Sequence, residues 1–279
     1  MKRRILKKIL LLDANNLIYR ARYSAKFARE GDAAIVYSFF RSLKPILEKF
    51  KPDLCYFVRD GSRAGRNDLL PEYKQNRKYE HDESFLKQKK MIETMINDYF
   101  PIILCRDRNL EADDLIGYLV MDKHFEDECV VVSSDTDFIQ LLQTHKNCLL
   151  YNPITKKNRE NPSYDYITWK SLRGDGADNI PGIPRVGDKT AEKLSIDPKK
   201  LDSFLAESSE RMEIFLRNKQ LITFKSPEKE EDIFFSENFL SEDRIKNIFE
   251  NLNFSSMVKE SYWNKYVSSM ESLNEENAR

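Results

Sequence analysis

The chain has 279 residues, of which 41% are hydrophobic and 33% are charged, a composition typical of a soluble globular protein with one substantial core and room for a small appended module. Its 46 basic and 46 acidic residues give a formal net charge of zero, so only the placement of charge along the chain can indicate a partner. The apolar run near the N-terminus ends at Asp13 and is too short for a signal peptide, and no other segment is long enough to span a membrane. We therefore expect a cytoplasmic protein without a membrane partner.

The cysteines and histidines do not form a metal-binding pattern. The four cysteines are widely spaced, form no C-x-x-C pair and mostly sit in apolar runs: Cys55, Cys105, Cys129 and Cys148. This pattern is typical of small buried residues in a reducing compartment and argues against a structural zinc site. The three histidines have no ligand-like spacing, and we expect them at the surface: His81, His124 and His145.

Short apolar runs alternate along the chain with longer helical patterns. The runs expected as strands are Ile9–Leu12, Leu54–Val58, Pro101–Leu104, Cys129–Val132 and Cys148–Tyr151. Helical periodicity covers Ala33–Phe50 and Phe85–Tyr99, and further helices are expected after Glu111 and after Asp137. This alternation predicts an α/β fold, with a mainly parallel sheet covered by helices on both faces and ligands bound beyond the carboxyl ends of the strands.

Acidic residues stand at the predicted ends of several strands. Asp13 follows the first strand, Asp60 follows the second, and the clusters Glu111–Asp114 and Asp135–Asp137 flank the strand Cys129–Val132. A lone Asp after a strand is more often a helix cap or a turn residue, but independent caps would not need doubling. Because like charges packed beside a sheet need neutralising cations, and because the ligands are all oxygens, the pattern predicts bound Mg²⁺ or Mn²⁺.

The stretch RAGRNDLLPEYKQNRK, Arg63–Lys78, combines positive charge with an aromatic ring. Its basic residues and its tyrosine are Arg63, Arg66, Tyr73, Lys74, Arg77 and Lys78. This mixture favours nucleic acid, although a charged run is often only a solvated helical face. The pattern indicates few contacts with the apolar core, so we expect the stretch to be mobile without DNA and ordered by phosphates.

A different unit follows the last predicted strand, with the sequence LRGDGADNIPGIPRVGDKTAEKL. Asp175 and Asp178 precede a hairpin at Gly182–Gly187, after which a helix begins at Asp188. Glycines allow backbone N–H groups to approach a phosphate, and the helix N-terminus adds its positive end, so the unit predicts a clamp on the DNA backbone. The glycine spacing also resembles the start of an ATP-binding P-loop, but Asp188 stands at the required Lys position and no strand precedes it. An ordinary turn between two helices is the remaining alternative.

Taken in this order, LLLDANN, VRDG, LPEYKQNR, LEADD, SSDTD and GDGADNIPGIPRVGDKTA resemble the flap endonuclease family of 5′ nucleases, most closely the stand-alone phage enzymes of the T5 type. The resemblance covers Ile9 to Leu194. It implies a PIN-like nuclease domain over residues 1–160 with a helical arch at about 61–90, and a helix-hairpin-helix module of the three-turn-helix form with C-terminal helices over 161–279. It also implies a monomer, located in the host cytoplasm if the protein is phage-encoded.

The resemblance further implies two Mg²⁺ ions, for which Mn²⁺ substitutes. One ion is assigned to Asp13, Asp60, Glu111, Asp113 and Asp135, and the other to Asp135, Asp137, Asp175 and Asp178, with Asp114 nearby. On the arch, Lys74 and Arg77 are the candidates to contact the scissile phosphate, and Tyr73 is the candidate to stack on a base. The other candidate DNA contacts are Arg63, Arg66, Lys78, Gly182, Gly187, Lys189 and Thr190.

Two positions depart from the family pattern, and one region is poorly informative. Val58-Arg59 precede Asp60 where the motif is often F-D-G, and Arg185 occupies a hairpin position that is commonly Gly. The second departure concerns the potassium ion that the family binds at this hairpin. Beyond residue 200 we expect helices such as Glu242–Leu252 to pack back on the nuclease core, and Ser268–Arg279 to form a frayed tail.

Three functions follow from these patterns. The first is a structure-dependent 5′ nuclease, both flap endonuclease and 5′-3′ exonuclease, which cuts DNA flaps, overhangs or junctions and RNA primers during replication by two-metal-ion catalysis. The second is a PIN-like ribonuclease for single-stranded RNA, which would need the acids but not the hairpin that grips a duplex. The third is a non-catalytic junction-binding protein, which would have lost acids, whereas all nine carboxylates are present.

Overall fold

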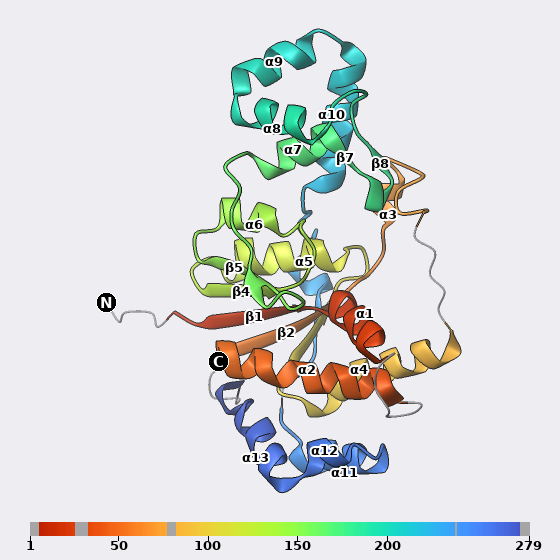
Figure 1. Ribbon diagram of the computed structural model, residues 1–279, viewed down its shortest axis with the longest axis vertical. Helices are drawn as coiled ribbons and strands as arrows, with labels where there is room; N and C mark the ends of the chain where they lie inside the picture. Colours follow the sequence, from red (N-terminus) through yellow and green to blue (C-terminus); the bar gives the residue numbers. More distant parts are fainter. Residues whose placement is uncertain (1–5, 26–32, 77–81, 238, 274–279) are drawn as a thin grey trace.

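The computed structural model describes residues 6–25, 33–76, 82–237 and 239–273. Within these ranges the centre is a seven-stranded sheet with the order β6-β5-β4-β1-β2-β3-β9 (Figure 1). Strands β1 to β5 run parallel, and the edge strands β6 and β9 pair antiparallel with their neighbours. The strands are β1 Lys8–Asp13, β2 Leu54–Arg59, β3 Ile103–Arg106, β4 Glu128–Val132, β5 Cys148–Asn152, β6 Lys157–Asn158 and β9 Phe234–Phe235. The predicted mainly parallel sheet is confirmed.

Helices follow the strands in the predicted alternation. They are α1 Ala14–Ala25, α2 Ala34–Phe50, α3 Ala64–Asn67, α4 Glu83–Tyr99, α5 Ala112–Tyr118 with a π-helical turn Leu119–Lys123, α6 Ile139–Thr144, α7 Tyr166–Arg173, α8 Asp188–Ile196, α9 Pro198–Ala206, α10 Ser209–Ile222, α11 Glu242–Asn251, α12 Ser255–Val258 and α13 Glu260–Ser268. Single 3₁₀ turns lie at Gly176–Asp178, Glu230–Asp232 and Glu271–Leu273.

Local sequence signals explain most of these bounds. The α2 helix ends where Lys51 adopts a left-handed conformation (φ 44°) before Pro52, and α4 begins at Asp82, whose side chain accepts a hydrogen bond of 2.6 Å from the Phe85 N–H. The strand expected at 101–104 instead begins at Ile103, because Pro101 has no N–H for the sheet ladder. These signals act over a few residues, which is why sequence patterns placed most elements well.

The alternation of side chains along β1 supplies both faces of the core. Leu10 and Leu12 pack with α1, α2, α4 and the C-terminal helices, whereas Ile9 and Leu11 pack with α5, the π-helical turn and α6. The chain runs from β1 outward to β2 and β3, and then returns to place β4 on the other side of β1. This reversal of strand order opens a crevice at the carboxyl ends of β1 and β4, the place where such sheets bind ligands.

The residues after 230 return to the main sheet and its helices, as predicted. Strand β9 pairs with β3, and α11 to α13 cover α2 and α4, where the Phe249 ring lies 5.5 Å from the Phe40 ring and the Tyr266 hydroxyl donates to the Phe40 carbonyl at 3.2 Å. The prediction of a frayed tail is wrong for its first part, because Met270 and Leu273 are buried. The rest of that segment, 274–279, lies outside the described residues.

A second, smaller core holds α7 to α10 together at one end of the molecule (Figure 1). Between α7 and α8, the strands β7 Gly174–Asp175 and β8 Ile180–Pro181 form a short antiparallel hairpin. The buried Asn218 of α10 donates to the carbonyls of Ser171 (2.9 Å) and Pro181 (2.8 Å). One side chain thus ties both α7 and the hairpin to α10.

The buried cysteines and histidines have structural roles. Cys55, Cys105 and Cys129 are buried free thiols, as predicted. The expectation of surface histidines is wrong for two of the three: His124 is buried between Asp127 and Tyr56, at 3.1 and 3.0 Å, and the buried His145 contacts the Phe125 carbonyl. His81 lies outside the described residues. Among the described residues, no helix has both the length and the apolar character needed to cross a membrane.

Candidate active site

Carboxylates gather at the carboxyl edge of the sheet. A cavity of about 580 Å³ is lined by four of the predicted metal ligands, Asp13, Asp60, Asp113 and Asp135, and by the cations Arg20, Arg63, Lys74 and Lys89. Two of the acids are held by the ends of neighbouring elements. The Asp13 carboxylate accepts hydrogen bonds from the Asn16 N–H (3.1 Å) and the Ser133 hydroxyl (2.8 Å), and Asp60 accepts one from the Ala112 N–H at 2.8 Å. We call these four acids the first acid group.

The first acid group is crowded: Asp13 is buried, Asp113 and Asp135 are half-buried, and Asp60 is exposed. The pKa of Asp13 is raised to about 7, mainly by burial and also by the nearby charges of Asp60 and Asp135, although the hydrogen bonds from Asn16 and Ser133 act to lower it. Burial also raises the pKa of Asp113 well above its ordinary value, with Asp135 the largest charge contribution and Lys74 acting in the opposite sense. Groups so disfavoured as anions are neutralised by a cation or a proton. The all-oxygen donor set fits a hard divalent ion.

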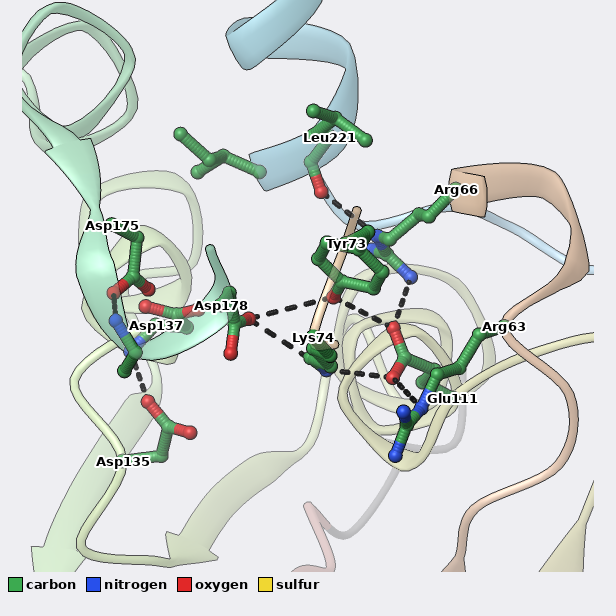
Figure 2. A network of polar contacts seen from close by, with 12 residues as sticks. Arg63, Arg66, Tyr73, Lys74, Glu111, Asp135, Asp137, Asp175, Asp178 and Leu221 are labelled. Atoms are coloured by element: carbon green, nitrogen blue, oxygen red, sulfur yellow. Dashed lines mark hydrogen bonds and ion pairs between the residues drawn. The ribbon is translucent and has the colours of Figure 1, made fainter. Parts of the chain in front are cut away.

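Glu111 lies beside this cavity but is held by cations (Figure 2). It accepts from the Lys74 Nζ at 2.6 Å, from the Tyr73 hydroxyl at 2.9 Å and from an Arg66 Nη at 3.0 Å, and Arg63 lies 3.7 Å away. Burial acts to raise the pKa of Glu111, but Lys74 and Arg66 outweigh it, so the pKa is lowered. The structure therefore brings Glu111 to the site as part of an ion-pair network with the basic stretch.

Asp114 and Arg66 form a closed, buried pair instead of facing the cavity. Both carboxylate oxygens accept from the guanidinium, at 2.6 and 2.7 Å, and the Lys225 N–H donates to the same carboxylate at 2.9 Å. The Arg66 Nε donates to the Leu221 carbonyl at 2.8 Å (Figure 2). The predicted roles of Asp114 as a metal ligand and Arg66 as a DNA contact do not fit this arrangement. Together they hold α3, α5 and the end of α10 in place.

A second acid group comprises Asp137, Asp175 and Asp178, each of which offers a carboxylate oxygen within 4.8 Å of the others. Asp137 follows β4, whereas Asp175 and Asp178 belong to the hairpin between α7 and α8. Asp135 connects the two groups, since its carboxylate accepts from the Asp137 N–H at 2.9 Å. The predicted second set of ligands is therefore assembled from two distant parts of the chain.

Lys170 lies beside the second acid group and was not predicted from the sequence. This buried lysine of α7 contacts the Asp137 carboxylate and lies 2.7 Å from Asp175. Burial raises the pKa of Asp137 to about 6 although Lys170 lowers it, while the pKa of Asp175 is lowered because Lys170 outweighs burial. The sequence did contain a signal for Lys170. It lies on the buried face of an amphipathic helix that leads directly into two acids.

Comparison with known proteins identifies the family. Residues 8–168 match the family described as 5′-3′ exonuclease, N-terminal resolvase-like domain. The chain belongs to this exonuclease family. It is 31% identical over 207 residues to DNA polymerase I of Caldicellulosiruptor bescii, a match that covers 67% of this chain and 24% of the relative. It is 29% identical over 206 residues to the 5′-3′ exonuclease of Mycoplasmopsis pulmonis, covering 70% and 68%. The chain thus spans about a quarter of the length of the polymerase relatives that it matches.

The fold of this exonuclease-family chain is that of a solved phage enzyme. The flap endonuclease of bacteriophage T5, crystallised with metal ions, superposes with a TM-score of 0.65 at 17% identity and covers 96% of this chain and 100% of its own. The same phage protein in a pseudo-enzyme-product complex with DNA and metal ions gives a TM-score of 0.62 at 20% identity, covering 77% and 89%. The predicted PIN-like fold is therefore confirmed.

In this family member, the basic stretch is packed over residues 63–76. Leu70 and Tyr73 form an apolar cluster with Ile180, Leu221 and Ile222, and the Lys74 N–H donates to the Asp178 carbonyl at 2.9 Å. The expectation of few core contacts is thus wrong here, because the partners come from the distant α7–α10 module. Tyr73 is only 4% exposed and donates to Glu111, so its ring is covered rather than open to a base. Arg77 and Lys78 lie outside the described residues.

The glycines of the predicted hairpin serve different purposes. A Cβ at Gly182 would lie 2.0 Å from the Arg173 carbonyl oxygen, so glycine is required there by packing against α7. Gly187 is exposed just before α8, and Lys189 and Thr190 are exposed on the first turn of that helix. These three residues stay predicted DNA contacts. Arg185 has φ 67°, a left-handed conformation that favours glycine. This backbone conformation explains why glycine is common at this position. Arg185 adopts the same conformation at some cost in conformational energy.

Proposed function

We propose that this chain is a structure-dependent 5′ nuclease that hydrolyses phosphodiester bonds where single-stranded DNA meets a duplex, at 5′ flaps, overhangs and junctions. The observation that carries the proposal is the pair of acid groups joined by Asp135, directly beside the basic stretch. An RNA primer annealed to DNA is a further substrate of the same geometry. Membership of the family, a relative named 5′-3′ exonuclease and a phage protein named flap endonuclease support it.

The two acid groups would each hold one divalent ion, Mg²⁺ with Mn²⁺ as a substitute. Asp13, Asp60, Asp113 and Asp135 would ligate one of them, and Asp135 with Asp137, Asp175 and Asp178 the other. When bound, such ions lower the pKa of a coordinated water and stabilise the departing oxygen. We also propose that potassium binds at the Gly182–Gly187 loop and that the protein is a monomer.

The chain's own cations would position the phosphate. Lys74 and Arg63 line the cavity of the first acid group, so a phosphate placed there lies within reach of both. Lys74 would donate to a non-bridging oxygen and stabilise the charge that develops during cleavage. In the structure the Lys74 Nζ is held between Glu111 (2.6 Å) and Asp178 (3.7 Å). The same two carboxylates therefore orient Lys74 before substrate arrives.

The α7–α10 module favours a duplex substrate over single-stranded RNA. Its exposed helix start at Gly187–Thr190 offers N–H groups and a lysine to a phosphate backbone. The decisive experiment compares a 5′-flap DNA, labelled at either end, with a single-stranded RNA, each incubated with Mg²⁺ and with Ca²⁺. We expect Mg²⁺-dependent cuts close to the flap junction and little cleavage of RNA. Faster cleavage of the RNA would replace the proposal with the ribonuclease alternative, and binding without cleavage of either would favour the junction-binding protein.

A further inference from the structure

A second groove lies next to the acid cavity. It runs between the outer face of α4 and the strands β3 and β9, and has a volume of about 540 Å³. Four cations line it, Arg59, Lys89, Lys90 and Arg106, against two acids, Glu93 and Asp98. The excess of positive charge is notable in a chain with no net charge. Such a groove attracts a polyanion.

The groove also offers apolar surface at both of its walls. Leu86 of α4 is 48% exposed and Phe234 of β9 is 44% exposed. Arg106 faces Phe234 across the antiparallel β3–β9 pair, with its guanidinium carbon 5.3 Å from the ring centroid. An exposed ring flanked by a guanidinium is a platform on which a nucleobase can stack, and cations along the same groove can hold the backbone phosphates.

Three of the cations surround a single carboxylate. Arg59 lies 3.0 Å from Glu93 through its Nε, and the charges of Arg59, Lys89 and Arg106 all act to lower the pKa of Glu93, which burial raises. Three cations therefore share one mostly buried carboxylate as their counterion. Lys90 is exposed on the neighbouring turn of α4. The groove keeps positive charge that its own acids do not balance.

The groove adjoins the acid cavity. Lys89 lines both spaces, and its Nζ donates to the Asn15 side chain at 2.7 Å, which in turn donates to the Asp60 carboxylate. Arg59 directly precedes Asp60 at the end of β2. A strand whose phosphate lies at the first acid group therefore meets the groove at its next nucleotides. The α7–α10 module and α4 lie on opposite sides of the sheet (Figure 1).

We propose that this groove binds the single-stranded 5′ portion of the substrate, on the side of the scissile phosphate away from the duplex. The inference rests on the proposed 5′ nuclease function, in which the α7–α10 module holds the duplex. It assigns phosphate contacts to Lys89, Lys90 and Arg106, and base stacking to Phe234. A flap that reaches into the groove should bind more tightly than one that ends at the acid cavity.

The test compares two substrates that share a duplex, one with a flap of about ten nucleotides and one with a single-nucleotide flap, a range that spans the usual reach of single-strand sites. Binding in Ca²⁺ and single-turnover cleavage in Mg²⁺ are measured for Lys90→Glu and Phe234→Ala. For Lys90→Glu we expect about tenfold weaker binding of the long flap and a salt dependence lower by about one phosphate contact. For Phe234→Ala we expect a loss of several-fold without a change in salt dependence.

The short flap is the internal reference, because it does not reach Lys90 or Phe234 and reports folding of each variant. Lys146→Glu, an exposed lysine before β5 at the amino end of the sheet, is the matched charge control. Equal losses on both substrates, or no loss on the long flap, would overturn the groove assignment. Failure of the unmodified protein to cleave either substrate would instead overturn the proposed function, so the two failures are distinct.

Discussion

Both acid groups bring several carboxylates close together, but the charges around them differ. The first acid group is built at the ends of β1, β2, β4 and the start of α5, and the pKa values of its Asp13 and Asp113 are raised. The second acid group draws Asp175 and Asp178 from the α7–α10 module, and Lys170 lies among its carboxylates. Cations of the chain, among them Lys74, line the cavity of the first group and only partly offset the raised pKa of Asp113. The second carries a counterion of its own, with which a metal ion must compete.

Asp135 lies between the two acid groups, so its replacement should affect both of them. We expect Asp135→Asn to slow single-turnover cleavage of a flap substrate by at least about a thousandfold, since both ion sites lose a ligand. Calorimetric titration with Mn²⁺ should show weakened binding of both ions. A variant that loses only one ion would show that the groups do not share Asp135.

Asp178→Ala tests the second acid group alone. Cleavage should slow by about a hundredfold or more, while binding of the flap substrate in Ca²⁺ stays within about twofold, because the ligand is lost but the DNA-binding surfaces remain. Its pairing with Lys74 at 3.7 Å is weak, so the fold should tolerate the change. A nearly unchanged rate would remove Asp178 from the site.

Lys170→Met tests the internal counterion. Removing one partner of a buried ion pair leaves Asp137 and Asp175 facing each other, so we expect a loss of about 3 kcal/mol in the free energy of unfolding without metal. Added Mn²⁺ should restore more stability to this variant than to the unmodified protein, measured by thermal unfolding. Lys193→Met, at an exposed position of α8, is the control. If Mn²⁺ stabilises both proteins equally, Lys170 does not occupy the place of a metal.

Lys189→Ala should have the smallest effect and should leave both acid groups intact. Lys189 is exposed on the first turn of α8, so its loss should weaken DNA binding uniformly over sequences and lower the salt slope by about one. Cleavage at saturating enzyme should persist. A fall in the saturated rate with unchanged affinity would link this lysine to the chemistry instead.

Much of the fold was predictable because its signals are local. Strand and helix periods, the cap at Asp82 and the stop before Pro52 act over a few residues. The same holds for Asp13 and Asp60, which follow their strands directly. Once parallel strands are expected, their carboxyl ends must meet at one edge, so the first acid group could be predicted from the sequence alone.

The burial of the basic stretch could not be predicted in this way. Leu70 and Tyr73 look like isolated apolar residues in a charged run, and their partners Leu221 and Ile222 lie about 150 residues further along the chain. No period in the sequence connects these segments. The pattern therefore indicated a mobile stretch where the structure has a packed one over residues 63–76.

The sequence by itself determined which residue types stand at the strand ends, because one strand and the acid after it form a local unit. Only the tertiary structure decided how those acids are neutralised. Arg66 pairs with Asp114, Lys74 with Glu111, and Lys170 with Asp137, across separations of 48, 37 and 33 residues. The physical reason is that the pKa of a carboxylate depends on burial and on charges within a few ångströms, and folding, not sequence order, sets both.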